Sequence, residues 1–313
     1  MRIPMLAAAA ALLLLAGIQD VHCKERSLTN PLLKYMSFKE IRPFKYKIEK
    51  YLTQKKADGV LNEVAFYFRD LADGNWVGID EDKSFSGASL HKVPLMIAYY
   101  KLAEKDPSIL KKELKYDILM PEVRDYVPAD MPVPGKYYTV DELIRIMIQQ
   151  SDNNALIILT NNIDAAYPAA VIRYLGLGHV DENDNSDNVS LKNIITMFRV
   201  LYNASYLNVN MSEKALRCLD GTCFDQGIVA GVPRTVTVAN KFGERYYISQ
   251  GVRELHECAI VYYEKNPYLI GIMTRGKDYS KLLEIISTLS KMVYDEVDSQ
   301  YHSKDEFFGP VQP

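Results

Sequence analysis

A serine and a lysine three residues apart, Ser89 and Lys92, form the first pair whose types and spacing can do chemistry. They follow Gly87 and Ala88 at the predicted start of a helix, where residues three apart share a face. A lysine amine within reach of a serine hydroxyl makes a nucleophile and its base. Free N–H groups and the positive dipole end of the helix favour an oxyanion beside Ser89. The pair therefore predicts acyl transfer through a serine.

Spacing alone is weak evidence, because Ser108 and Lys111 repeat it. We interpret that second pair as a surface turn and helix start after Asp106-Pro107. Pro94 lacks a backbone N–H, so the first turn after Ser89 is predicted to be irregular. The chemistry then depends on what the rest of the chain adds.

A second motif, Ser151-Asp152-Asn153, follows an apolar helical stretch. It offers a further hydroxyl to shuttle a proton, and an amide to hold a substrate or a lysine. An ordinary helix cap is the alternative interpretation. The triplet recurs as Ser186-Asp187-Asn188 in a loop rich in Asp and Asn, where we assign it no role.

A third motif, Lys241-Phe242-Gly243, is predicted at the end of a strand. A lysine there can hold a substrate carboxylate, and a glycine lets the substrate backbone approach closely. Taken alone, this motif predicts little.

In this order the three motifs resemble the signature of penicillin-binding proteins and class A β-lactamases. Their surroundings are similar too. Residues 76–105 resemble the hairpin and nucleophile helix of that family, and residues 138–156 the helix that leads into its Ser-Asp-Asn loop. Residues 231–243, followed by two strands and a helix, resemble its C-terminal half. The resemblance covers residues 65–297, most of the chain.

The resemblance implies that Ser89 attacks an amide carbonyl and is acylated, with Lys92 as its base. Lys92 must be neutral for this, which burial and the positive charge of Lys241 favour. Ser151 would relay a proton to the leaving nitrogen. The implied catalytic set is Ser89, Lys92, Ser151 and Lys241.

Substrate binding is implied at Asn153, which positions Lys92 or the substrate, and at Gly243. The backbone N–H groups of Ser89 and Glu244 would form the oxyanion hole. Phe242 departs from the family pattern, because Thr or Ser usually supplies a hydroxyl there for the substrate carboxylate. Carboxylate recognition is therefore expected to be weaker or differently built, and the substitutes we suggest, expected at strand ends, are His256 and Arg275.

The loop between the second and third motifs is shorter than in class A enzymes, whose loop carries a Glu that activates the deacylating water. The acids available here are Asp181 and Glu182. Ser186 stands where Glu182 would need an Asn, and only Asp181 has an Asn, Asn185, four residues on. If the glutamate is missing, acylation proceeds while hydrolysis of the acyl-enzyme is slow.

Strand patterns lie near both ends of the chain, and helical patterns fill its middle. A hairpin is predicted over residues 64–68 and 76–79, and the helix after Ser89 is predicted to bury one face. Later strands are predicted at 235–241, 259–263 and 268–274, helical stretches at 139–149, 155–161, 191–202 and 212–219, and a last helix at 280–297. This order predicts an α/β (α+β) fold, an antiparallel five-stranded sheet flanked by helices with an inserted all-helical domain.

The N-terminal apolar run at 5–18 follows Arg2 and is shorter than the roughly 20 residues of a membrane span. It predicts an export signal. The chain is therefore expected in the periplasm, at the cell surface or outside the cell; cleavage, lipidation and retention as an anchor stay open. The predicted divisions are 1–23 signal or anchor, 24–58 leader and first helix, 59–298 catalytic domain (α/β part 59–105 and 225–298, helical part 106–224) and 299–313 polar tail.

The net charge of −3 provides no broad basic field, so nucleic acid is not an expected partner, and a membrane is expected only if the N-terminal segment is retained as an anchor. The chemistry needs no cofactor, and a monomer is expected. Ile260 stands where a zinc motif beginning at His256-Glu257 would need its second histidine, so no metal is predicted. Cys218 and Cys223 are close enough in sequence to pair, or are small core residues like Cys258.

Three functions compete. The leading one is a β-lactamase-like serine hydrolase that opens β-lactams through an acyl-enzyme with slow deacylation. A D-alanyl peptide carboxypeptidase or transpeptidase acting on cell-wall peptides would use the same Ser89 chemistry. A binding protein without turnover is favoured by Phe242 and the missing glutamate, and disfavoured by the four polar residues of the catalytic set.

Overall fold

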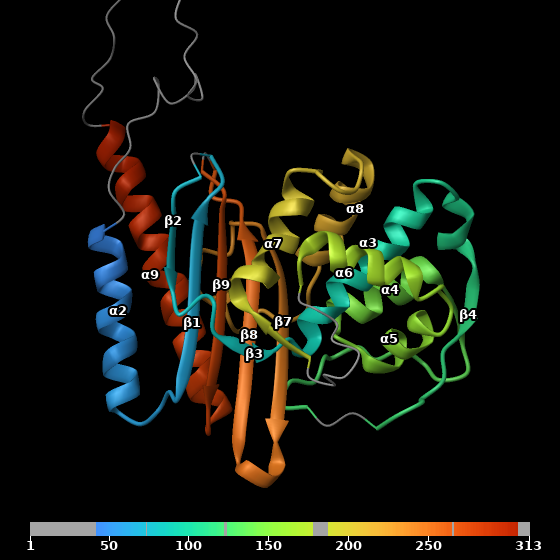
Figure 1. Cartoon of the computed structure of the whole chain (residues 1–313), viewed down its shortest axis with the longest axis horizontal. Coiled ribbons are helices and arrows are strands. Elements are labelled where there is room, and N and C mark those ends of the chain that lie inside the picture. Colours follow the sequence, from blue (N-terminus) through green and yellow to red (C-terminus); the bar gives the residue numbers. More distant parts are fainter. Residues whose placement is uncertain (1–41, 73, 122–123, 178–186, 265, 306–313) are drawn as a thin grey trace, which may run out of the picture. The chain divides into compact units, whose positions relative to one another are not determined.

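The computed structural model describes residues 42–72, 74–121, 124–177, 187–264 and 266–305. Its centre is an antiparallel sheet of five strands in the order β2-β1-β9-β8-β7 (Figure 1). The strands are β1 (Glu63–Asp70), β2 (Trp76–Ile79), β7 (Val238–Tyr247), β8 (Val252–Val261) and β9 (Tyr268–Gly276). The α/β fold and the five-stranded sheet built from both ends of the chain are as predicted.

The β7–β8 hairpin is longer than predicted. Its strands pair from Val238 opposite Val261 to Tyr247 opposite Val252, so the Lys241-Phe242-Gly243 motif lies inside β7 and His256 inside β8. Neither is at a strand end, as had been expected. The apolar pattern stops at Gly243 because the outer half of the hairpin is largely exposed, and a period-2 signal requires one buried face.

Helices cover both faces of the sheet (Figure 1). On one face lie α2 (Arg42–Ala57) and α9 (Tyr279–Asp305), and on the other α7 (Leu191–Tyr202). The sheet meets α7 closely at Gly271, where a Cβ atom would stand 2.7 Å from Leu191 Cδ1. The last helix is longer than predicted, since residues 299–305 of the expected polar tail continue it.

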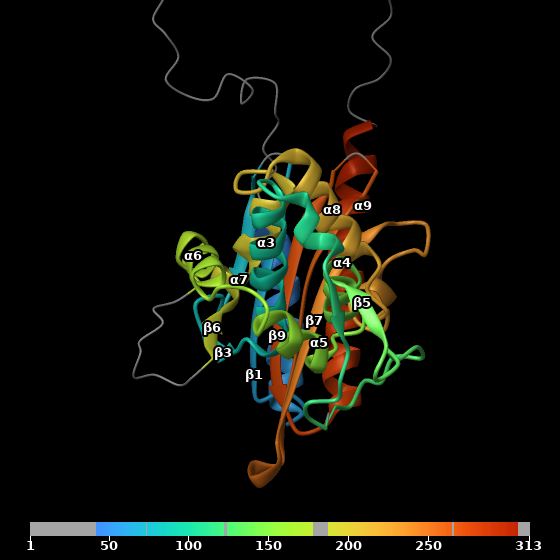
Figure 2. The ribbon, with the colours of Figure 1, turned by 90° about the vertical axis from the view of Figure 1, so that its right-hand side faces the viewer.

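The remaining helices form a group beside β7 and face the viewer in Figure 2. They are α3 (Lys92–Ala103), α4 (Val140–Gln149), α5 (Asn153–Thr160), α6 (Ala166–Leu175) and α8 (Val209–Asp220). Two features of this region were missed: helix α6, and the short strand pairs β3 (Ser84–Ser86) with β6 (Asn188–Ser190) and β4 (Glu113–Lys115) with β5 (Tyr137–Thr139).

Helix α3 is buried all round rather than on one face. Every residue from Lys92 to Tyr100 is buried, because helices pack on several sides of it and η2 (Ala88–His91) leads into it. A helix that is apolar all round belongs in a core. This burial carries the side chain of Lys92 into the interior.

Among the described residues no helix is both long and apolar enough to cross a bilayer. The described cysteines, Cys218, Cys223 and Cys258, are free thiols. The suggested pairing of Cys218 with Cys223 is therefore not formed, and the interpretation as small core residues fits Cys218 and Cys258, which are buried. Residues 1–41, which include the predicted export signal, lie outside the described residues.

Candidate active site

Ser89 lies in a tight turn at the N-terminal end of helix α3. The turn is a short 3₁₀ helix, η2, and Lys92 is the first residue of α3. Pro94 is the third residue of the helix, where its missing N–H would have had no intrahelical partner. The irregular first turn predicted after Ser89 is present as η2, but it precedes Pro94, whose missing N–H therefore does not explain it. Ala88, just before Ser89, has φ 42°, in the left-handed region that residues with a Cβ rarely adopt.

The side chain of Lys92 joins the first motif to the second. Its Nζ donates to Asn153 Oδ1 at 2.7 Å and to Ser151 Oγ at 3.3 Å, and also to the carbonyl oxygen of Ser151. Only 1% of Lys92 is exposed. Three oxygens thus fix a buried amine one helical turn from Ser89.

Lys241 joins the third motif to the same point. Its Nζ donates to Ser151 Oγ at 2.9 Å and to the carbonyl oxygen of Phe242 at 2.8 Å. Burial, together with the neighbouring Lys92, holds the pKa of Lys241 well below its ordinary value. Ser151 therefore sits between two buried amines that cannot both be protonated without a cost in free energy.

Local capping explains how Ser151 is held there. Helix α4 starts with a capping box between Thr139 and Glu142. Helix α5 starts at the cap residue Asp152, whose carboxylate accepts from Ala155 N at 2.6 Å and from the Tyr116 hydroxyl at 3.0 Å. Between the two helices Ser151 has φ 56°, a conformation that costs about 1–3 kcal/mol and persists only where its surroundings enforce it. The helix-cap interpretation of the second motif thus holds for Asp152, while its two neighbours contact the lysines.

Strand β7 packs closely against the turn that contains Ser89. A Cβ atom on Gly243 would lie 3.0 Å from Ser89 N and 3.3 Å from Leu90 N. The absence of a side chain keeps open the space beside the Ser89 N–H. Glu244 comes next along the strand, and its side-chain carboxylate accepts from Asp125 N at 3.2 Å and Tyr126 N at 3.3 Å. Burial raises the pKa of Glu244 to about 7.

Phe242 fills an aromatic cluster. It is 2% exposed and stacks on Phe224 at a centroid distance of 4.2 Å, with Tyr126 edge-on at 5.2 Å. Its ring also lies 4.4 Å from Lys241 Nζ. The residue that usually supplies a hydroxyl is here part of the core, in contact with the lysine.

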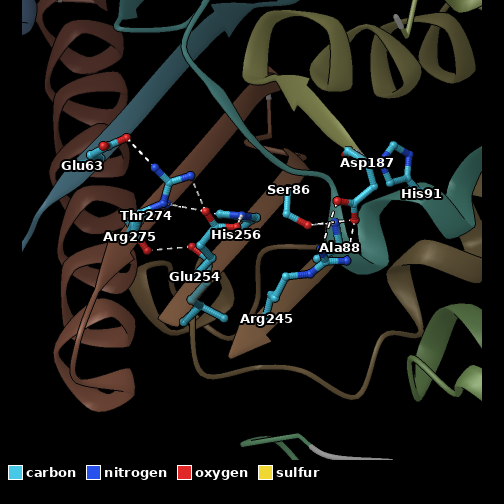
Figure 3. Close-up of polar contacts among 11 residues, drawn as sticks. Glu63, Ser86, Ala88, His91, Asp187, Arg245, Glu254, His256, Thr274 and Arg275 are labelled. Atoms are coloured by element: carbon cyan, nitrogen blue, oxygen red, sulfur yellow. Dashed lines mark hydrogen bonds and ion pairs between the residues drawn. The ribbon is translucent and has the colours of Figure 1, made fainter. Parts of the chain in front are cut away.

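His256 and Arg275 are engaged with carboxylates (Figure 3). Arg275 Nε donates to Glu254 Oε1 at 2.7 Å, and Arg275 Nη1 donates to Glu63 Oε2 at 2.8 Å. His256 is fully buried, accepts from Thr274 N at 3.3 Å through Nδ1 and lies 3.4 Å from Glu254 through Nε2. The charge that Arg275 would offer a substrate carboxylate is thus already balanced by two acids.

Asp187 is a residue that the sequence interpretation missed. Its carboxylate forms two hydrogen bonds with Arg245, at 2.6 and 3.0 Å, and accepts from Ser86 Oγ at 2.9 Å (Figure 3). Its carbonyl oxygen accepts from Gly87 N and contacts His91 Nε2, both at 2.9 Å. Asp187 therefore ties the turn before Ser89 to strand β7. The only signal for Asp187 in the sequence was its place in the second Ser-Asp-Asn triplet.

The two acids considered for deacylation, Asp181 and Glu182, lie outside the residues that the structure describes.

Several known proteins share this fold. The chain is similar to a structure of PBP-A (TM-score 0.67, 20% identity, covering 82% of this chain and 96% of that one). It is also similar to a class A β-lactamase from Mycobacterium abscessus (0.67, 21%, 80% and 99%) and a β-lactamase from Xanthomonas campestris pv. campestris (0.69, 19%, 81% and 98%). No curated protein matches the sequence. A model of the Beta-lactamase enzyme family matches residues 43–297, and the chain therefore belongs to that family.

Proposed function

We propose that this protein is a serine hydrolase that opens β-lactams through an acyl-enzyme on Ser89 and releases the product slowly. The observation that carries the proposal is the meeting of three motifs at Ser151 Oγ, which takes hydrogen bonds from Lys92 and Lys241. Family membership supports a β-lactamase-like hydrolase. A further similar structure is described as a PBP-A variant in an acyl-enzyme complex with penicillin G (TM-score 0.68, 19% identity).

Acylation uses the groups in sequence. Lys92, in its neutral form, takes the proton of the Ser89 hydroxyl as Oγ attacks the lactam carbonyl carbon. The N–H groups of Ser89 and Glu244 stabilise the oxyanion that forms. Ser151 gives its proton to the leaving nitrogen and is reprotonated from the lysines that contact it, and the lactam C–N bond breaks. The product is an ester on Ser89; the ring nitrogen carries the proton from Ser151, and the proton lost from Ser89 restores Ser151 by way of Lys92.

Slow deacylation follows from how the nearby acids are used. Rapid attack of water on the ester is expected to need a carboxylate that can take its proton, because the family resemblance gives that step to a Glu. The described carboxylates around the site are each held by other groups, namely Asp152 by Tyr116 and Ala155, Asp187 by Arg245 and Ser86, Glu244 by two backbone N–H groups, and Glu257 by Ile228 N and Asn240. None of these is a free base.

A D-alanyl peptide carboxypeptidase or transpeptidase is the second candidate. The likeness to a structure of PBP-A is the observation that favours it. Phe242 does not separate it from a β-lactamase, because a peptide ending in D-alanyl-D-alanine carries a carboxylate just as a β-lactam does. The binding-protein hypothesis predicts no turnover of either substrate.

The clamp formed by Asp187 and Arg245 leads to a prediction about positioning. Asp187→Asn keeps the shape but loses the charge that holds Arg245 and Ser86, so the turn before Ser89 loosens. We expect acylation by penicillin to slow about 10–100-fold, the range that a small displacement of reacting groups costs. Stopped-flow acylation rates measure this. Arg245→Gln should slow the reaction as much, and the double variant no further.

The control for this prediction is Asp82→Asn, which removes a surface ion pair with Lys192 and should leave the rate unchanged. Equal rates for Asp187→Asn and the unaltered protein would show that the clamp does not position Ser89.

One experiment separates the candidate functions. The full-length protein is mixed with excess penicillin G, and separately with a diacylated peptide ending in D-alanyl-D-alanine, and released product is measured. A burst equal to the protein concentration, followed by slow release from penicillin, supports the proposal. Rapid release of D-alanine with only inert acylation by penicillin would favour the peptidase, and product from neither would favour a binding protein.

A further inference from the structure

A cavity of about 360 Å³ lies on the face of the sheet that α7 covers, beside strands β1 and β2. Tyr67, Arg69 and Trp76 line it from the strands, and Lys192, Thr196 and Arg199 line it from α7. None of these residues takes part in the site around Ser89. We call this cavity the β1–α7 groove; its volume lies at the small end of the range for small-molecule sites.

An aromatic platform forms one wall of the groove. Trp76 is the only tryptophan of the chain, and it is 48% exposed although it stacks on Tyr67 with centroids 5.7 Å apart and planes 17° apart. In the strand register Trp76 stands opposite Arg69, and Gly78 opposite Tyr67. A flat, half-exposed indole ring in a cavity offers a π face to the C–H groups of a ligand ring.

The groove also holds positive charge without a balancing acid. Lys192 pairs with Asp82 at 3.2 Å. Arg69 and Arg199, however, have no side-chain hydrogen bond or ion pair with any part of the chain that the structure describes. This contrasts with the same sheet's Arg245, Arg253 and Arg275, each of which is paired with a carboxylate.

Two guanidinium groups facing one cavity repel each other, and an anion between them offsets that repulsion. Arginine binds carboxylate oxygens with a planar fork of N–H donors, which fits an organic acid better than a simple ion. The exposed face of Trp76 calls for a ligand with a flat C–H face. A sugar ring has one that packs on indole, while its hydroxyls reach polar groups such as Thr196.

We propose that the β1–α7 groove binds an acidic saccharide, with a sugar ring on Trp76 and its carboxylate between Arg69 and Arg199. The identification of its source rests on the proposed function, since a hydrolase of β-lactams and cell-wall peptides works beside glycan strands, whose lactyl carboxylates are free where no stem peptide is attached. The groove would then hold the polymer while Ser89 acts elsewhere on it. Nucleic acid fits less well, because the chain has a net charge of −3 and the groove offers only two unpaired arginines.

Trp76 makes the test specific, because all tryptophan fluorescence of the full-length protein comes from this groove. The fluorescence is titrated with the disaccharide N-acetylglucosaminyl-N-acetylmuramic acid, and with N,N′-diacetylchitobiose, which lacks the lactyl carboxylate. We expect a saturable change with the acidic sugar and binding about tenfold weaker with the neutral one, the effect of one lost charge-assisted contact. The double variant Arg69→Gln/Arg199→Gln should lose this preference.

Two controls keep the result separate from catalysis and from folding. Ser89→Ala should leave the titration unchanged, so a failure of the proposed function does not alter the outcome here. The double variant should keep the emission spectrum of the unaltered protein, which shows that the Trp76–Tyr67 stack is intact.

Each of three results would overturn the proposal. One is the absence of any saturable change with the acidic sugar up to about 10 mM, well beyond the millimolar affinity of a weak site. The second is equal binding of both sugars or an acid preference that survives in the double variant. The third is a response only to a short oligonucleotide, which would assign the groove to a different class of ligand.

Discussion

Replacing Ser89 with alanine is expected to abolish covalent labelling of the protein by penicillin. The hydroxyl of Ser89 is the group that forms the ester, and no neighbouring side chain can take its place: Ser151 Oγ lies between Lys92 and Lys241 in the interior. Removal of a catalytic serine costs on the order of 10⁶-fold in rate in a well-studied hydrolase. The measurement is labelling with a fluorescent penicillin on a denaturing gel.

The chain carries its own matched control. Ser108 has a lysine three residues on, as Ser89 does, but it lies in an exposed 3₁₀ turn where its hydroxyl donates to Asp106. Ser108→Ala should label like the unaltered protein. If Ser89→Ala is labelled with as many penicillin molecules per protein as the unaltered protein, another group is acylated.

Lys92→Ala is the second change for which we expect a large effect. The amine of Lys92 is the proposed base, and general-base catalysis contributes about 10²–10⁴-fold to a rate. We expect the upper part of that range, because Lys92 also fixes Ser151 and Asn153 through its hydrogen bonds. Stopped-flow acylation by penicillin measures the loss, and Lys111→Ala in the second Ser-x-x-Lys pair is the control.

Two readouts separate a base from a structural lysine. A small primary amine added to Lys92→Ala should restore part of the acylation rate, since it can enter the space that the side chain leaves. A slow rate caused only by lower thermal stability should not be restored by the amine. If the folded variant acylates at the normal rate, Lys92 is not the base.

Local patterns in the sequence predict the parts of the structure that depend on local physics. The hairpin of β1 and β2 follows from the strand patterns on either side of Asp73-Gly74, which need only a few neighbouring residues. The three motifs, by contrast, meet at Ser151 across 59 and 90 residues of chain, and their meeting was implied by the family resemblance and not by local patterns.

The contacts that sequence reasoning missed are long-range. Asp187 and Arg245 are 58 residues apart, and no local pattern around either residue predicts that they are in contact. Arg275 was considered for substrate binding because it was expected at a strand end. The structure pairs it with Glu63 and Glu254, which lie on two other strands. Strand register decides such pairings, and the polar outer half of the β7–β8 hairpin hides the register from a hydrophobic pattern.

Parts of the site are more deeply buried than the hydrophobic pattern of the sequence predicts. Helix α3 was expected to bury one face, yet its position among other helices buries every residue from Lys92 to Tyr100. Phe242 looked like a weakened substrate contact, whereas its ring completes a cluster with Phe224 and Tyr126. In both cases the environment is set by elements far away in the chain.

Acylation of Ser89 is tested by the intact mass of the full-length protein, followed over time after mixing with penicillin G. We expect one adduct per protein, of the mass of the whole penicillin because ring opening loses no atoms, formed fast and lost slowly. An adduct that never forms, or one that also forms on Ser89→Ala, would contradict it.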